Sequence, residues 1–310
     1  MKIFNTIEEI KNIGPCALAL GNFDGVHLGH QELISLAVNT AKERGLKSGV
    51  LTFANHPKNL MPGRNVRNIL YKNEKEEIIA SLGVDYLFNI PFTRDIMTME
   101  PIKFVEELLV GKCNIKAAFC GFNYKFGFKA SGNPDILRAC GKEKGFTVTE
   151  MEPYMIDGQV VSSTLLRELI SKGQVEKCAK FMGRNYEIGG EVVVGNRLGR
   201  KLGFPTSNLM IDEDMVTPPN GVYVTYCTYN GVKYPSVTNV GKKPTIGEYK
   251  KNVETHIFNF DKELYGKNII VEFLKKTRDE KKFDSVEELS AQIVKDCLNA
   301  KEFHKIDVDK

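Results

Sequence analysis

Residues 16–31 read CALALGNFDGVHLGHQ, an apolar run followed by a glycine-rich turn that leads into an amphipathic stretch. Cys16–Leu20 is short and entirely apolar, which indicates a buried β-strand. Glu32–Glu43 has apolar residues at helical spacing. A strand that turns directly into a helix is the repeating unit of doubly wound parallel sheets, which bind ligands beyond the carboxyl ends of their strands. The turn Gly21–Gln31 is therefore the first candidate for a functional site.

The same alternation of short apolar runs and amphipathic stretches continues to about Gly183. Strand, helix and strand in this rhythm predict parallel strands joined by right-handed crossovers. We expect an α/β domain with a parallel sheet over residues 1–183. Its further strands are predicted at Ser48–Phe53, Val84–Ile90, Ala117–Cys120 and Phe146–Glu150, and its further helices at Glu74–Leu82 and Pro101–Val110.

The pattern changes in residues 184–310, where segments rich in Val, Tyr, Thr and Ile are separated by Gly, Pro and Asn turns. Segments of this kind without intervening helices predict an antiparallel barrel or sandwich of about six strands. Ser285–Ala300 has the pattern of a closing helix, and its Ser285 and Glu288 form the Ser-x-x-Glu pattern of a capping box. The sequence thus predicts two domains, 1–183 and 184–310.

The composition excludes several classes of protein. The 43 Lys and Arg residues against 39 Asp and Glu give a net charge of +4, too weak to indicate a nucleic-acid partner. The opening MKIFNTIEEI lacks the apolar core of a signal peptide, and no apolar run approaches the ~18 residues of a membrane span. The seven cysteines form no CxxC pair, so we expect reduced, mostly buried thiols in a cytoplasmic protein. The sequence does not indicate whether the chain forms an oligomer.

The turn after the first strand has the residues needed to hold a phosphate. His27 and His30 are three residues apart and would share one face of the first helical turn. Gly29 has no Cβ, so the backbone there can approach a phosphate, and a helix amino terminus offers free N–H groups to the same anion. The pattern also fits a helix cap whose histidines only pack. A metal site of Asp24, His27 and His30 is a further alternative.

Segments that could complete this site follow later predicted strands. TFANHP places His56 beyond the second strand, and GFNYKFG places Asn123 beyond the fourth. SSTLLR begins a helix, where Ser163, Thr164 and Arg167 could hold a departing pyrophosphate.

Taken together, these segments resemble the adenylyltransferase module of the prokaryotic bifunctional riboflavin kinase/FAD synthetase (FMN adenylyltransferase) family. The family pattern is GxFDGxHxGHQ, a PHP-like segment, a G-x-D/N-F-x-F-G segment and SSTxxR; this chain departs from it at Asn55, Tyr124 and Leu165. The resemblance implies a Rossmann-like nucleotidylyltransferase domain in which His27 and His30 bind ATP phosphates, and His56 and Asn123 bind flavin. The implied phosphate-binding residues are Gly21, Asn22, Phe23, Asp24, Gly29, Ser163, Thr164 and Arg167.

A second candidate site lies in GNRLGRKLGFPTSN, residues 195–208, between the first two predicted strands of the second domain. Thr206 and Asn208 are hard oxygen donors two residues apart, which suits Mg²⁺ shared with nucleotide phosphates. No Gly-Lys pair precedes Ser or Thr, so a kinase here is not of the P-loop type. In VETHIFNF, strand alternation puts Glu254 on the opposite face from Val253 and Thr255.

These two segments match the riboflavin kinase module of the same family. The resemblance implies a six-stranded Greek-key barrel in which Gly195, Gly199 and Gly203 contact ATP, Thr206 and Asn208 bind Mg²⁺, and Glu254 takes the proton from the riboflavin 5′-hydroxyl. The expected substrates are riboflavin, FMN and ATP.

Two other functions compete with this interpretation. One is a different HxGH nucleotidylyltransferase, for example one acting on phosphopantetheine, with a barrel of unrelated use. The other is a flavin- or RNA-binding regulator that keeps both folds without turnover; the weak net charge and the lack of a basic and aromatic stripe disfavour RNA.

Overall fold

The computed structural model describes residues 1–195, 199, 202–245 and 248–306, without the side chains of 242–250. The chain divides into two compact units, Met1–Ser163 and Thr164–Lys310. This division lies before the boundary at residue 183 that the sequence predicts, which stays a prediction.

A six-stranded sheet of parallel strands forms the centre of the first unit, in the order β1-β4-β3-β2-β5-β6. The strand β2 begins and ends where the sequence predicts, and the parallel sheet is confirmed. The edge strand β1 was not predicted from the sequence. The strand bounds are β1 Lys2–Phe4, β2 Cys16–Leu20, β3 Lys47–Phe53, β4 Tyr86–Ile90, β5 Ile115–Gly121 and β6 Thr147–Met151.

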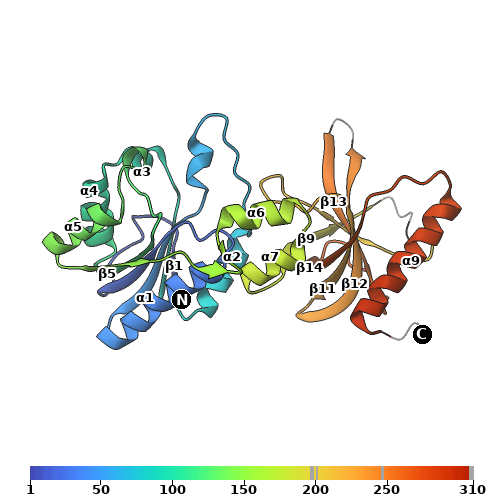
Figure 1. Ribbon diagram of the computed structural model, residues 1–310, viewed down its shortest axis with the longest axis horizontal. Coiled ribbons are helices and arrows are strands. Elements are labelled where there is room, and N and C mark those ends of the chain that lie inside the picture. Colours follow the sequence, from blue (N-terminus) through green and yellow to red (C-terminus); the bar gives the residue numbers. More distant parts are fainter. Residues whose placement is uncertain (196–198, 200–201, 246–247, 307–310) are drawn as a thin grey trace. The chain divides into compact units, whose positions relative to one another are not determined.

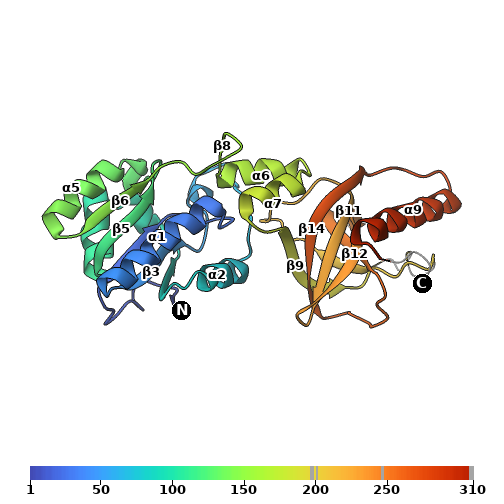
Figure 2. The ribbon, with the colours of Figure 1, turned by 60° about the horizontal axis from the view of Figure 1, so that its bottom comes forward.

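Helices cover both faces of this sheet (Figures 1 and 2). Helix α1 packs on β2, β3 and β5. Leu18 and Leu20 are alternate residues of β2 and belong to a core cluster with Phe104 and Leu108. The helical segment that contains Phe104 and Leu108 therefore packs on the face of the sheet opposite α1. The remaining elements are a short hairpin, β7 (Met155–Ile156) and β8 (Gln159–Val160), and the helical segments. Their bounds are α1 Leu28–Arg44, η1 Pro57–Leu60, α2 Lys72–Ser81, α3 Arg94–Thr98, α4 Pro101–Lys103, the π-helical η2 Phe104–Lys112, η3 Phe128–Ala130 and α5 Pro134–Lys144.

The second unit is built on a closed barrel of antiparallel strands in the order β10-β13-β12-β11-β14-β9. Strands β11, β12 and β13 follow one another as hairpins and β14 returns beside β11, which is a Greek-key arrangement. The predicted six-stranded barrel is confirmed. Its strands are β9 Tyr186–Val193, β10 Ser207–Met210, β11 Gly221–Tyr229, β12 Val232–Thr245, β13 Glu248–Ile257 and β14 Asn268–Asp279.

In the described part of this unit the barrel strands are accompanied by α6 (Ser163–Ser171, which begins at the boundary), α7 (Val175–Met182) and α9 (Val286–His304). Helix α7 packs on β14 and β9, and the closing helix α9 covers β11 and β12 (Figure 1). The predicted cap of α9 is present, because the Ser285 side chain accepts a hydrogen bond from the Glu288 N–H at 3.1 Å.

The structure also bears on the predicted state of the thiols. All seven cysteines are buried and free, and burial raises the pKa of each thiol above its ordinary value. Among the described residues, no helix combines the length and apolar character that a membrane crossing requires.

Candidate active sites

His27 is the amino-terminal cap of α1. Its Nδ1 accepts a hydrogen bond from the His30 N–H at 3.1 Å, so the neutral ring carries its proton on Nε2. The two imidazoles stack with their ring centres 3.6 Å apart and their planes 14° from parallel. The structure thus brings together the two histidines that the sequence selects, at a helix amino terminus that offers N–H groups to an anion.

The imidazole of His30 is enclosed by protein. Its Nδ1 is fully buried and has no hydrogen-bond partner in the described part of the chain. The Phe23 ring contacts it edge-on, with the ring centres 5.1 Å apart. Burial lowers the pKa of His30 well below its ordinary value, and His27 and Lys75 lower it further by charge repulsion. His30 is therefore a neutral ring near pH 7, suited to donating or accepting a hydrogen bond.

Lys75 of α2 is a member of this site that the sequence analysis missed. Its ammonium donates to the Asn22 carbonyl at 2.9 Å, to Thr52 Oγ1 at 2.8 Å and to the Phe53 carbonyl at 3.2 Å. It therefore ties the loop after β2 to the end of β3. Burial lowers the pKa of Lys75 to about 8, although Asp24 and Glu76 act in the opposite direction.

The loop between β2 and α1 is held in a strained shape. Val26 and Phe23 have positive φ angles of 31° and 49°, which are rare for side chains of these kinds. The Asp24 carboxylate accepts from the Ile69 N–H at 3.0 Å, and the Asp24 carbonyl accepts from the Ser163 hydroxyl at 2.7 Å. These bonds fix the loop from two later segments of the same unit.

Gly29 lies where a larger residue would be crowded. A Cβ there would stand 3.0 Å from Tyr154 Cβ and 3.4 Å from His27 Nδ1. Any side chain at this position would therefore press on the cap that orients His27.

The other predicted residues of the first site have separate positions. His56 caps η1 through its Nδ1, which accepts from the Lys58 N–H at 3.2 Å. Asn123 is exposed in the loop after β5. Thr164 and Arg167 lie on α6 in the second unit, so their part in the site stays a prediction. Among the described residues, no three His, Cys, Asp or Glu side chains are grouped to hold a metal, which leaves the alternative metal site without support.

In the barrel, Asn208 of β10 lies directly opposite Glu254 of β13. Asn252, two residues before Glu254, joins the two side chains. Its Nδ2 donates to Asn208 Oδ1 at 3.0 Å and to Glu254 Oε1 at 2.9 Å. Asn208 and Asn252 are buried and Glu254 is partly buried, whereas Val253 and Thr255 are fully buried on the opposite face, as strand alternation predicts.

Asn252 was not selected from the sequence either. Strand alternation could have found it, because residues i and i+2 share a face and the motif already selects Glu254.

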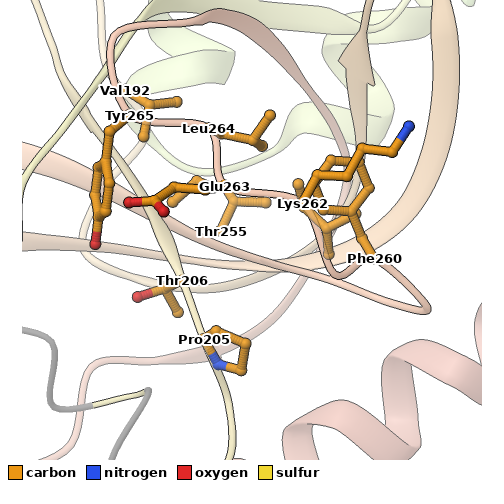
Figure 3. Close-up of a pocket in the computed structure, with 11 residues that line it drawn as sticks. Val192, Pro205, Thr206, Thr255, Phe260, Lys262, Glu263, Leu264 and Tyr265 are labelled. Atoms are coloured by element: carbon orange, nitrogen blue, oxygen red, sulfur yellow. The ribbon is translucent and has the colours of Figure 1, made fainter.

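A pocket of about 50 Å³ lies on the Thr255 face of β13, opposite the face that carries Glu254, and Figure 3 shows its lining. Thr206 lines it, with its hydroxyl on the same side as the carboxylate of Glu263 and the hydroxyl of Tyr265. Phe260 and Lys262 form the other side. Thr206 also connects to the cluster through its backbone, because its carbonyl lies 3.5 Å from Asn208 Nδ2.

The glycines of the second motif meet different local requirements, and Gly195 allows close packing against Asn208. A Cβ on Gly195 would lie 2.5 Å from Asn208 Nδ2. The carbonyl of Gly199 accepts from the Phe204 N–H at 2.8 Å, and Gly203 has a φ of 87°. Residues 196–198, 200 and 201 of the motif lie outside the described residues.

Comparison with protein families gives one match for each half of the chain. A model described as FAD synthetase matches residues 9–165, and a model described as riboflavin kinase matches residues 182–304.

Similar proteins cover nearly the whole chain. A protein of Haemophilus influenzae named bifunctional riboflavin kinase/FMN adenylyltransferase is 36% identical over 290 residues, which are 93% of this chain and 94% of the relative. One of Bacillus subtilis with the same name is 35% identical over 303 residues, 94% of this chain and 92% of the relative. A crystal structure titled as a macrolide-efflux protein from Streptococcus pneumoniae is 29% identical and superposes with a TM-score of 0.89, covering 97% of this chain and 98% of that one.

Proposed function

Because the chain belongs to the bifunctional riboflavin kinase/FMN adenylyltransferase family, we propose that it makes FMN from riboflavin and then FAD from FMN, using ATP in both steps. The barrel transfers the γ-phosphoryl group of ATP to riboflavin, which gives FMN and ADP. The parallel-sheet unit joins the AMP part of ATP to FMN, which gives FAD and pyrophosphate. The observation that carries the proposal is that each half has both its family match and a polar cluster suited to its reaction.

For the adenylyl transfer, the FMN phosphate attacks the α-phosphorus of ATP and pyrophosphate leaves. The attacking phosphate is already ionised, so the protein has only to position the reactants and stabilise charge. His27, whose Nδ1 is occupied by the cap, presents its Nε2–H as a donor to the α-phosphate. The amino terminus of α1 and the Lys75 ammonium add positive potential at the same place.

For the kinase reaction, the riboflavin 5′-hydroxyl attacks the γ-phosphorus and gives up its proton. Glu254 is the base that takes this proton, and its carboxylate is oriented by Asn252. The hydroxyl is a poor nucleophile at neutral pH, so a positioned carboxylate contributes roughly 10²–10⁴-fold to the rate.

Mg²⁺ fits the donors that this site offers. The Asn208 amide oxygen is oriented by Asn252, and Thr206, two residues earlier, carries a hydroxyl. Both are hard oxygen donors of the kind that Mg²⁺ prefers. The ion would supply positive charge to the phosphoryl oxygens as ATP reacts.

The test is to incubate the purified chain with MgATP and riboflavin and to separate the flavins by chromatography. FMN that appears first and FAD that follows, with ADP and pyrophosphate in matching amounts, support the proposal. A flavin-binding regulator would leave riboflavin unchanged. A nucleotidylyltransferase with a different acceptor would make neither FMN nor FAD. The cytoplasmic location expected from the sequence agrees with an enzyme that consumes ATP, and stays a prediction.

A further inference from the structure

We infer that Asn252 is a positioning residue of the kinase site, which sets the orientation of the Asn208 amide from the charge of Glu254. The inference rests on the proposed kinase function and deepens it. It concerns a residue that lies outside the motifs of the sequence analysis, two positions before the proposed base on the same face of β13.

The first step is the orientation of Asn252 itself. An ionised carboxylate can only accept hydrogen bonds, so the end of the Asn252 amide that faces Glu254 Oε1 at 2.9 Å must be the NH₂ group. The two ends of an amide side chain otherwise have almost the same shape. The charge of Glu254 therefore decides which way round Asn252 stands.

The second step passes this choice to Asn208. The same Asn252 NH₂ group lies 3.0 Å from Asn208 Oδ1, so the end of the Asn208 amide that faces it must be the oxygen. Reversing Asn208 would bring two NH₂ groups together. Glu254 thus fixes the position of an oxygen that the proposed site uses for Mg²⁺, although the two residues are on different strands.

The burial of the polar Asn252 side chain reduces the stability of the fold, which indicates a role beyond packing. Asn252 is 2% exposed, and its Oδ1 is buried with no hydrogen-bond partner among the described residues. A buried polar atom without a partner is destabilising, because it has given up its hydrogen bonds to water. Packing alone would be served better by an apolar residue of similar size, so the polarity of Asn252 is explained by the orientation that it imposes.

The experiment measures nucleotide binding in the full-length chain by titration calorimetry with MgADP, together with riboflavin phosphorylation. Both units are expected to bind MgADP. The part of the binding that Asn208→Ala weakens is assigned to the barrel, and the remainder is assigned to the first unit. We expect Asn252→Leu and Asn252→Asp to weaken this component about 10–100-fold, as changes to residues that orient metal ligands do. Asn268→Leu, an exposed asparagine at the start of β14, is the matched control and is expected to bind normally.

A double variant tests the link between the two asparagines. If Asn252 acts through Asn208, then Asn208→Ala with Asn252→Leu binds MgADP no more weakly than Asn208→Ala alone. Additive losses, or normal MgADP affinity in folded Asn252→Leu, would overturn the inference. If Asn252→Leu does not fold, Asn252→Asp, which has nearly the same shape, decides by the same measurement. A wild-type chain that neither phosphorylates riboflavin nor has an Asn208-sensitive component would overturn the proposed function, and this inference with it.

Discussion

His27 caps helix α1 by accepting the His30 N–H at its Nδ1, so one side chain both begins the helix and keeps its ring proton on Nε2. These two roles can be separated by substitution. Asparagine is a good helix cap but has no imidazole, whereas alanine removes the cap and the ring together.

We predict that His27→Asn folds normally and that its rate of FAD formation from FMN falls about 10²–10³-fold, as for the loss of one donor to a developing charge. His27→Ala should lose the same activity and also about 1 kcal/mol of stability from the missing cap. Thermal unfolding and the rate of FAD formation check the two effects. Riboflavin phosphorylation serves as the internal control, and its loss in His27→Asn would contradict the assignment.

The buried ring of His30 predicts a pH dependence of stability. Its pKa in the folded chain is well below the unfolded value of about 6.5, so below that pH the unfolded chain binds the proton first. Stability should therefore fall as the pH drops from about 6.5, with a slope of at most about 1.4 kcal/mol per pH unit from this group. His30→Gln should reduce the slope in urea unfolding series between pH 5 and 7. An unchanged slope would show that His30 does not titrate on unfolding.

The sequence was a good guide to the elements with strong local patterns. Strand β2 was predicted to the residue, because CALAL is apolar throughout and is bounded by Pro15 and Gly21. Strand β1 was missed because three residues, Lys2–Phe4, are too few for a periodic pattern. Its place in the sheet comes from pairing with β4, a contact about 80 residues away in sequence.

The candidate sites show the same limit. His27 and His30 could be selected because they lie in one contiguous motif whose spacing has a chemical meaning. Lys75 could not, because its amphipathic helix has two lysines and three glutamates, and nothing in the sequence distinguishes one lysine from the other. Only the packing of α2 against the ends of β2 and β3 selects the one lysine that reaches Asn22 and Thr52.

Lys75 gives a prediction for the adenylyl transfer. Lys75→Met should slow FAD formation about 10–100-fold, because the loop that positions the reactants loses three hydrogen bonds, while riboflavin phosphorylation stays normal. In the wild-type chain the activity should fall as the pH rises through about 8, where Lys75 loses its proton. Asp24, Glu76 and His30 are the titratable groups around it.

The pH dependence has its own check. Lys75→Arg keeps the positive charge at all these pH values, so its alkaline decline should move to higher pH even if its rate is lower. The pKa of Lys75 is lower in the folded chain than in the unfolded chain. Burial of the protonated side chain therefore reduces the free energy of unfolding below pH 8, and this reduction disappears between about pH 8 and 10.4. A decline near pH 8 that persists in Lys75→Arg would assign it to another group.

The two proposed activities should be separable by cutting the chain. A fragment of residues 164–310 should phosphorylate riboflavin and make no FAD. A fragment of residues 184–310 should do the same but be less stable, because it loses α7, whose buried Phe181 and Met182 each contribute about 1.5–3 kcal/mol. Thermal unfolding and chromatography of flavins compare the two. A folded 164–310 fragment without kinase activity would contradict the assignment of that step to the barrel.

The role of Glu254 is tested by Glu254→Gln, which keeps the shape of the side chain but cannot take a proton. We predict that kinase turnover falls about 10²–10⁴-fold, the usual contribution of a positioned general base. The affinity for ATP should fall less than in Asn252→Leu, because the glutamine oxygen can still accept from Asn252, although a neutral amide no longer forces Asn252 to face it with its NH₂ group. Adenylylation of supplied FMN should be unaffected, since its nucleophile is already ionised.

The control is Glu191→Gln, which changes an exposed carboxylate on β9. Glu263 is a less suitable control, because it lines the same pocket as Thr206. Riboflavin phosphorylation by Glu254→Gln at the normal rate would mean that the carboxylate only supports the structure.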